Sequence, residues 1–97
     1  MLSRLFTKSF QNFAVICKSA EEAIHGIKSG DNLLVGGFGI CGVPMNLINA
    51  VKVSGVKNLT VASNNCGVGD KEGKYDWGLA VLLRTKQIKR MISSYVG

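Results

Sequence analysis

The segment from Leu33 to Leu47, "LLVGGFGICGVPMNL", decides the fold of this chain. It begins as a short apolar run, becomes dense in glycine, and then passes through Pro44 into residues with helical spacing. An apolar run bounded by glycines predicts a strand over residues 32–37 that is apolar on both faces, as strands of parallel sheets are. Pro44 suits the first turn of a helix, where its missing N–H is not needed. The predicted buried face of this helix consists of Leu47, Ile48 and Val51, and Gly55 is placed to end it.

The elements around this segment alternate between helix and strand signals. The sequence "SAEE", residues 19–22, is a capping box that begins a helix, and Gly30 is placed to end that helix. "NLTVAS" at residues 58–63 predicts a second strand, "LAVLLRT" predicts a short helix, and residues 88–94 predict a third strand. The expected fold class is therefore α/β, a mainly parallel sheet with flanking helices built as a βαβαβ unit.

The chain has 97 residues, which is at most one small domain, and a formal net charge of +6. Half of that excess belongs to residues 1–18, which hold three basic residues and no acidic one. The other basic cluster is interpreted as a solvated face, because no aromatic side chains interleave with it. No apolar run approaches the roughly 18 residues of a membrane span. We therefore expect neither a nucleic acid nor a membrane as partner. The cluster consists of Arg84, Lys86, Lys89 and Arg90.

The N-terminal sequence "MLSRLFTKSFQNFAVICKS" has the composition of a mitochondrial transit peptide. It is basic, rich in hydroxyl groups and free of acidic residues, and its phenylalanines are spaced along one face of a helix. This pattern predicts that residues 1–18 are a transit peptide and that the protein is located in the mitochondrial matrix. A basic disordered tail is the alternative interpretation. The phenylalanines are Phe6, Phe10 and Phe13.

The cysteines and the single histidine do not indicate a metal site. Cys17, Cys41 and Cys66 are odd in number and widely spaced, and no C-x-x-C motif or histidine cluster accompanies them. We therefore expect no metal, no disulfide framework and reduced thiols. His25 lies on the polar side of the first helix, which favours a surface position over a role as ligand or base.

The glycine-rich turn matches G-x-G-x-x-G, the fingerprint of dinucleotide-binding loops. That fingerprint requires an acidic residue at the end of the second strand, where this chain has "VASN". The dinucleotide interpretation is therefore disfavoured. The turn still offers backbone N–H groups and a helix N-terminus to a carboxylate, a phosphate or a developing oxyanion. A tight strand-to-helix turn without a ligand explains the glycines equally well.

Two adjacent amides, Asn64 and Asn65, follow the second predicted strand. Ligands of open α/β sheets bind at the carboxyl ends of the strands, so these side chains are expected to face the glycine loop. There they could donate hydrogen bonds to a carboxylate or thioester oxygen. An Asx-type turn that ends the strand is the alternative interpretation.

Three motifs in order resemble the family I CoA-transferases. They are "GDNLLVGGFGICGVPMNLI", "LTVASNNCG" and "LLRTKQIKRMISSYVG", and the resemblance extends over about residues 19–97. It implies an enzyme of ketone-body catabolism that transfers CoA from succinyl-CoA to a 3-oxo acid such as acetoacetate. In this family the reaction passes through a covalent glutamyl-CoA intermediate, whose glutamate lies in the second half of the enzyme.

The resemblance also implies which residues bind substrate. Asn64, Asn65 and Tyr95 would orient the substrate, and the glycine loop would line the acyl pocket. No cofactor is expected, because coenzyme A enters as the thioester substrate, and the full-length enzyme would be a homodimer. The loop residues are Gly36, Gly37, Phe38, Gly39 and Gly42.

The sequence departs from the family pattern in three ways. Met45 stands where the family usually has glutamate, and the loop at residues 68–77 is longer than usual. No glutamate of this chain matches the nucleophile motif, so no catalytic residue is assigned. Residues 19–97 are therefore expected to be the N-terminal part of a CoA-transferase domain, inactive by itself. A non-catalytic half-domain that serves as a binding or dimerisation module is the alternative.

Overall fold

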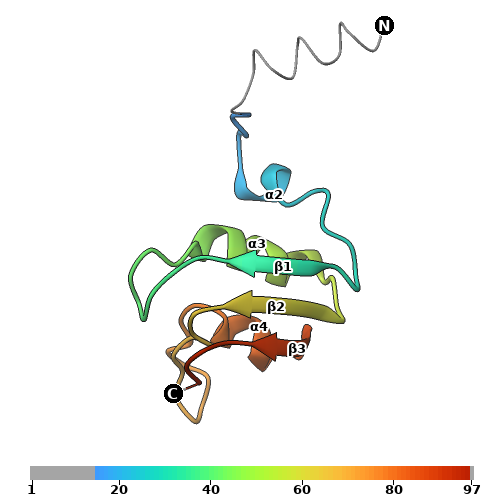
Figure 1. Ribbon diagram of the computed structural model, residues 1–97. Helices are drawn as coiled ribbons and strands as arrows, with labels where there is room; N and C mark the ends of the chain where they lie inside the picture. The colour runs from blue at the N-terminus through green and yellow to red at the C-terminus, as the bar shows by residue number, and fades with distance from the viewer. Residues whose placement is uncertain (1–14, 97) are drawn as a thin grey trace, which may run out of the picture.

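The computed structural model describes residues 15–96, which form a three-stranded parallel sheet with helices (Figure 1). The strands are β1 (Asn32–Val35), β2 (Leu59–Ser63) and β3 (Ile88–Ile92), in the spatial order β1-β2-β3. Helices α3 (Met45–Ser54) and α4 (Ala80–Arg84) connect them, and the one-turn helix α2 (Ala20–Ala23) precedes β1. The predicted parallel βαβαβ unit is confirmed. The predicted transit peptide lies mostly outside the described residues.

The register of the sheet places chemically similar residues side by side. Leu33 of β1 lies opposite Val61 of β2, and Val61 lies opposite Met91 of β3. The β2–β3 ladder shifts register once, because Leu59 pairs with Ile88 while Thr60 pairs with Arg90. Lys89 is thus an extra residue in β3, and it forms a β-bulge.

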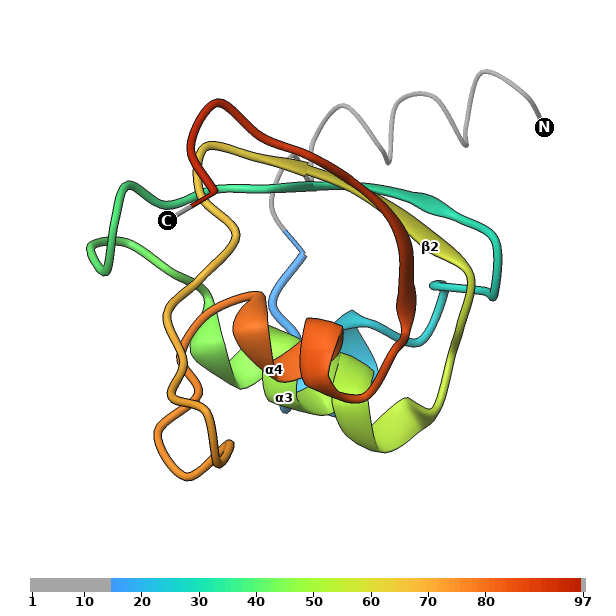
Figure 2. The same ribbon diagram turned by 90° about the horizontal axis from the view of Figure 1, so that it is seen from below.

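The core lies between one face of the sheet and the helices α3 and α4. Figure 2 shows α3 and α4 on the same face of the sheet, and within residues 15–96 no helix covers the opposite face. Leu59 and Val61 of the central strand are fully excluded from solvent, at 0% exposure. The remaining buried apolar residues of the core are Ile48, Val51, Leu79, Val81 and Leu82. Burial of these side chains is the main favourable contribution to folding.

Strand β1 is apolar on both faces as predicted, but only one of these faces is covered within residues 15–96. Leu33 and Val35 point toward the helices and are half-buried, whereas Leu34 is 89% exposed. Successive side chains of a strand point to opposite faces, and both connecting helices of this chain lie on the same face. The opposite face of β1 therefore has no cover within residues 15–96.

The first helix is shorter than predicted. Its capping box forms, because the Ser19 hydroxyl accepts a hydrogen bond from the Glu22 backbone N–H at 3.1 Å. The helix ends at Ala23, however, and Gly30 instead forms a turn before β1, with a φ of 90°. Gly26 interrupts the helical pattern, and a glycine inside a helix is unfavourable.

Helix α3 begins and ends close to the predicted residues. Pro44 occupies the N-cap, one residue before the helix, and Gly55 ends it in the left-handed conformation with a φ of 77°. The buried face contains Ile48 and Val51 as predicted, but Leu47 remains 40% exposed.

Gln87 joins the end of α3 to the start of β3 and is 3% exposed. Its side-chain N–H groups donate to the carbonyls of Val51 at 3.0 Å and Val56 at 2.9 Å. Its side-chain oxygen accepts a hydrogen bond from the Thr85 hydroxyl at 2.5 Å. Because every polar atom of this buried side chain has a partner, these hydrogen bonds offset the cost of removing Gln87 from water.

We predict that Gln87→Met destabilises the fold by about 2 kcal/mol, because the carbonyls of Val51 and Val56 then lose their donor. The measurement is the urea unfolding midpoint, followed by the fluorescence of Trp77. Lys89→Met is the matched control, since Lys89 is exposed and should leave the midpoint unchanged. Equal midpoints for the two variants would contradict this role of Gln87.

Candidate functional site

The carboxyl ends of the three parallel strands meet at one edge of the sheet (Figure 1). The glycine loop follows β1, residues 64–67 follow β2, and residues 93–96 follow β3. Ligands of open α/β sheets bind at this edge because loops from neighbouring strands converge there. All the residues for which the sequence predicted a substrate contact lie in these three segments.

The glycine loop folds back as a tight hairpin. Phe38 and Cys41 exchange two backbone hydrogen bonds, each of 2.9 Å. Gly37, Gly39 and Gly42 have φ values of 125°, 62° and 69°, which side chains rarely tolerate. The backbone conformation of this tight turn therefore accounts for the glycines at these three positions.

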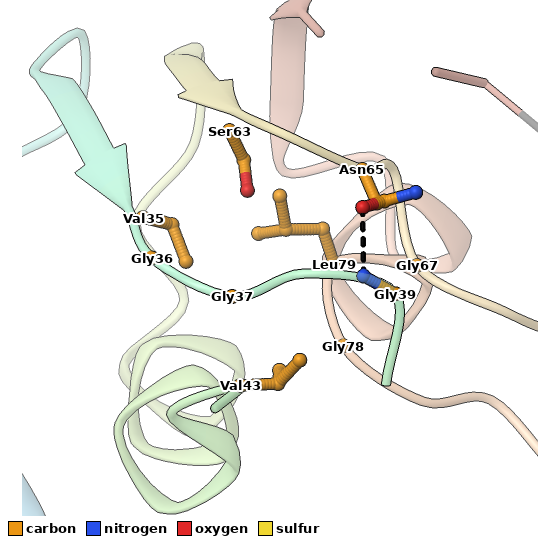
Figure 3. A pocket seen from close by; sticks show the side chains of 10 residues that line it. All are labelled: Val35, Gly36, Gly37, Gly39, Val43, Ser63, Asn65, Gly67, Gly78 and Leu79. Carbon is orange, nitrogen blue, oxygen red and sulfur yellow. Dashed lines mark hydrogen bonds between the residues drawn. The ribbon is translucent and has the colours of Figure 1, made fainter. Parts of the chain in front are cut away.

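Asn65 holds this loop in place across the gap between β1 and β2. Its side-chain oxygen accepts a hydrogen bond from the Gly39 N–H at 2.8 Å (Figure 3). The amide oxygen therefore points into the loop, and Figure 3 shows the side-chain nitrogen pointing away from it. That nitrogen carries two N–H donors at the edge of the sheet where ligands bind.

The cavity beneath this contact is small. It leaves about 10 Å³ of free volume, which is close to the minimum that holds one water molecule. At most a single oxygen-sized group would fit into the cavity. The lining residues drawn in Figure 3 include Gly36, Ser63, Gly67 and Leu79.

Asn64 does not contact the glycine loop. Its side-chain nitrogen donates to the Ser94 hydroxyl at 3.0 Å, and that hydroxyl donates to the Asn64 carbonyl at 3.2 Å. The same carbonyl accepts a hydrogen bond from the Tyr95 N–H at 3.2 Å. Asn64 therefore joins the carboxyl ends of β2 and β3, whereas Asn65 faces the loop after β1.

Tyr95 is also at this edge, beside Asn65. The two residues form an isolated parallel bridge, and the Tyr95 side chain is exposed. The sequence interpretation missed the serines next to it. Ser93 lies 3.0 Å from the Cys66 sulfur, through their Oγ and Sγ atoms, and Ser94 holds Asn64. Both could have been found by applying the strand-end rule to the third strand as well as the second.

The long loop at residues 68–77 is closed at its base. Val68 and Trp77 exchange backbone hydrogen bonds of 2.9 and 2.6 Å. Gly67 has no space for a side chain, because a Cβ there would lie 2.6 Å from the Trp77 carbonyl oxygen. The ends of the loop thus pack closely beside the small cavity, of which Gly67 and Gly78 form part.

An ion pair fixes the tip of the same loop. Arg84 donates to both carboxylate oxygens of Asp76 at 2.9 Å, and it also donates to the Asp70 carbonyl at 2.6 Å. The hydrogen bond from Arg84 lowers the pKa of Asp76, and Asp76 in turn raises the pKa of Arg84. This bidentate geometry orders the loop and explains the two charges without a ligand.

Met45 lies at the N-terminus of α3, close to the other loops of the site. Its sulfur accepts a hydrogen bond from the Gly78 N–H at 3.0 Å. The first turn of α3 has no acidic residue, so the favourable interaction of a carboxylate with a helix N-terminus is absent. The thioether is a weaker acceptor than the glutamate that the CoA-transferase resemblance leads one to expect at this position.

Residues 15–96 contain no group of three or more His, Cys, Asp or Glu side chains that could hold a metal ion. None of the helices in this part of the chain combines the length and apolar character needed to cross a bilayer. Cys17 and Cys41 are exposed and Cys66 is partly buried, and all three are free.

Comparison with known proteins identifies the family. The model of the coenzyme A transferase family matches residues 17–97, which is most of the chain. The chain belongs to this family. Its α/β fold, with three parallel strands, is that of part of a CoA-transferase domain.

Two similar proteins are bacterial, and each is named as one subunit of a succinyl-CoA:3-ketoacid coenzyme A transferase. The subunit from Bacillus subtilis, whose assignment is given as probable, is 54% identical over 82 residues, which are 84% of this chain and 32% of that protein. The corresponding protein from Helicobacter pylori strain J99 is 51% identical over 77 residues, or 79% of this chain and 31% of that protein.

A third relative is mitochondrial. Succinyl-CoA:3-ketoacid coenzyme A transferase 2B of Mus musculus is 46% identical over 76 residues, which are 78% of this chain and 14% of that protein. The chain thus spans about a third of the bacterial subunits and about a seventh of the mouse protein. The compartment of this chain does not follow from the match, because bacterial and mitochondrial relatives are both similar to it.

We predict that Asn65→Ala speeds hydrogen exchange of the Gly39 amide about fivefold, because one hydrogen bond worth about 1 kcal/mol is lost. NMR-detected exchange measures this effect residue by residue. Asn64→Ala is the matched control and should leave Gly39 unchanged, since Asn64 contacts β3 and not the loop. The Gly30 amide, bonded to the Lys57 carbonyl, serves as internal reference. Unchanged exchange of Gly39 in the Asn65 variant would contradict the assigned contact.

Proposed function

We propose that this chain supplies one side of a CoA-transferase site that moves CoA from succinyl-CoA to a 3-oxo acid such as acetoacetate. The contact between Asn65 and Gly39 carries the proposal. It fixes the glycine loop and directs the remaining amide donors of Asn65 toward the edge of the sheet where a substrate would lie. The bacterial and mouse relatives are named for this reaction, which supports the proposal.

The nucleophile of the proposed reaction is a glutamate carboxylate outside these 97 residues. The carboxylate attacks the thioester carbonyl of succinyl-CoA, and CoA leaves as a thiolate, giving a succinyl–glutamyl anhydride. The thiolate then attacks the glutamyl carbonyl of the anhydride, which releases succinate and leaves glutamyl-CoA. Acetoacetate repeats the two steps in reverse order and leaves as acetoacetyl-CoA.

Residues of this chain would assist by stabilising charge. Each step places negative charge on a carbonyl oxygen, and amide donors directed at that oxygen lower the barrier. Asn65 has such donors, and we propose the same role for backbone N–H groups of the glycine loop. Tyr95 would border the substrate from the end of β3, and Asn64 would act with Ser94 to hold that end in place.

The test is a chimera of the Bacillus subtilis protein in which its 82 matched residues are replaced by the aligned residues of this chain. Together with the companion subunit of that enzyme, the chimera should form acetoacetyl-CoA from succinyl-CoA and acetoacetate, followed by enolate absorbance. The 97-residue chain alone should give no turnover, because none of its glutamates matches the nucleophile motif of the family. In the chimera, Asn65→Ala should lower kcat by about 100-fold, as loss of an oxyanion donor does.

Two outcomes would contradict the proposal. One is a folded chimera, shown by association with the companion subunit, that has no turnover. The other is an Asn65→Ala chimera with unchanged kcat and KM, which would leave Asn65 only as a support of the glycine loop.

We also propose that residues 1–18 direct the protein into the mitochondrial matrix, on the basis of their acid-free, basic and amphipathic sequence. A fluorescent reporter fused after Lys18 should co-purify with the matrix in fractionated cells. Replacing Arg4 and Lys8 by glutamate is expected to abolish import, because the basic face is lost. Undiminished import of that variant would contradict the proposal.

A further inference from the structure

Ser63 is a polar residue in a row of core-facing side chains. Successive side chains of a strand point to opposite faces, so Leu59, Val61 and Ser63 of β2 share one face. Leu59 and Val61 are fully excluded from solvent and belong to the core. Ser63 lies beside Val35 of β1 and is only partly exposed. A hydroxyl at such a position costs free energy unless it has a hydrogen-bond partner.

No hydrogen bond joins the Ser63 hydroxyl to another group within residues 15–96. Figure 3 shows the hydroxyl pointing into the cavity, and the hydrogen bond drawn there joins Asn65 to Gly39 instead. The same part of the chain has no fully buried side-chain oxygen or nitrogen without a partner. The Ser63 hydroxyl is therefore not sealed in the core, and it can be reached from the cavity that it lines.

The cavity suits a single neutral oxygen. Its free volume of about 10 Å³ is close to that needed by one water molecule. Its other lining side chains are apolar except for Asn65, whose oxygen already accepts the Gly39 N–H. None of the lining side chains within residues 15–96 is charged. An unpaired carboxylate would lose its hydration here at a high cost, whereas a carbonyl oxygen can be satisfied by one hydroxyl donor.

We propose that the Ser63 hydroxyl donates a hydrogen bond to the 3-oxo oxygen of the acceptor acid, and that it thereby determines the preference for 3-oxo acids. The carboxylate of the acceptor lies beside the free N–H groups of Asn65, which lines the same cavity. One methylene group separates that carboxylate from the oxo group, which enters the cavity. This inference rests on the proposed function, because it assigns the residue that recognises the acceptor of that reaction.

An acid without the oxo group leaves the Ser63 hydroxyl unpaired. Sites that hydrogen-bond a polar group of the substrate discriminate strongly against analogues that lack it, because the buried polar partner is then unsatisfied. Succinate has no oxo group, so the half-reaction with succinyl-CoA does not use this hydrogen bond. The proposal therefore predicts a loss confined to one of the two substrates, which a general support of the site would not produce.

The test introduces Ser63→Ala into the chimera with the companion subunit. The kcat/KM for acetoacetate should fall about tenfold or more, because one hydrogen bond to the acceptor is lost. Exchange of labelled succinate with succinyl-CoA, which needs no 3-oxo acid, should change less than about twofold. Transfer to butyrate, which lacks only the oxo group, should be equal in the two proteins. Ser54→Ala, the same change at the end of α3 and outside the cavity, is the control that alters none of the three rates.

Stability separates recognition from a structural role. Because the Ser63 hydroxyl has no partner within residues 15–96, Ser63→Ala should not lower the urea unfolding midpoint of the 97-residue chain, followed by Trp77 fluorescence. A lowered midpoint would overturn the proposal, since it would assign the hydroxyl to the fold.

Binding provides a readout that does not need turnover. In the assembled chimera, saturation-transfer NMR should show that acetoacetate binds about tenfold more tightly than butyrate, and that Ser63→Ala removes this difference. A chimera without turnover that keeps this pattern contradicts the proposed reaction but supports the role of Ser63. The role of Ser63 is overturned if the preference for acetoacetate survives in Ser63→Ala. It is also overturned if acetoacetate transfer and succinate exchange fall equally, since the hydroxyl would then support the whole site, for example through a bound water.

Discussion

Parallel pairing of the three strands is the constraint on which the rest of this structure depends. Parallel neighbours cannot be joined by a tight hairpin, so each connection must cross back over the sheet, and here it does so through α3 and α4. Both crossings use the same face, which places the core there and buries Leu59 and Val61 completely. The same pairing brings the carboxyl ends of all strands to one edge, so that segments distant in sequence form a single site.

Features set by neighbouring residues were predicted from the sequence, and so was the parallel arrangement of the strands, whereas individual contacts between distant residues were not. The capping box at Ser19, the left-handed Gly55 and the glycine hairpin each depend on local conformation, and all three are present. The exposure of Leu34 depends on which face the helices cover, which its own sequence does not encode. The contact between Asn65 and Gly39 spans 26 residues, and the linking role of Gln87 spans more than 30. Such contacts follow only once the strands are in register.

The two neighbouring asparagines have different hydrogen-bond partners, although they are identical residues at the same strand end. Side chains of consecutive residues point in opposite directions at a strand end. Asn65 therefore bonds to the loop after β1, and Asn64 bonds to Ser94 after β3. Because the two amides have different partners, loss of one is not equivalent to loss of the other. A sequence pattern of two adjacent amides cannot reveal this difference, although it correctly indicates the edge of the sheet at which they lie.

Strand β1 leads directly into the candidate site. Val35 ends β1 and also lines the small cavity, and the glycine loop begins at the next residue. Pairing with β2 restrains the backbone that leads into this loop, while Asn65 restrains the far side of the loop through Gly39. Amide donors stabilise a developing charge only when they are held in place beforehand. The glycine loop is thus supported from both of its sides, by strand β1 where it begins and by Asn65 at Gly39, and the proposed role of its N–H groups depends on both supports.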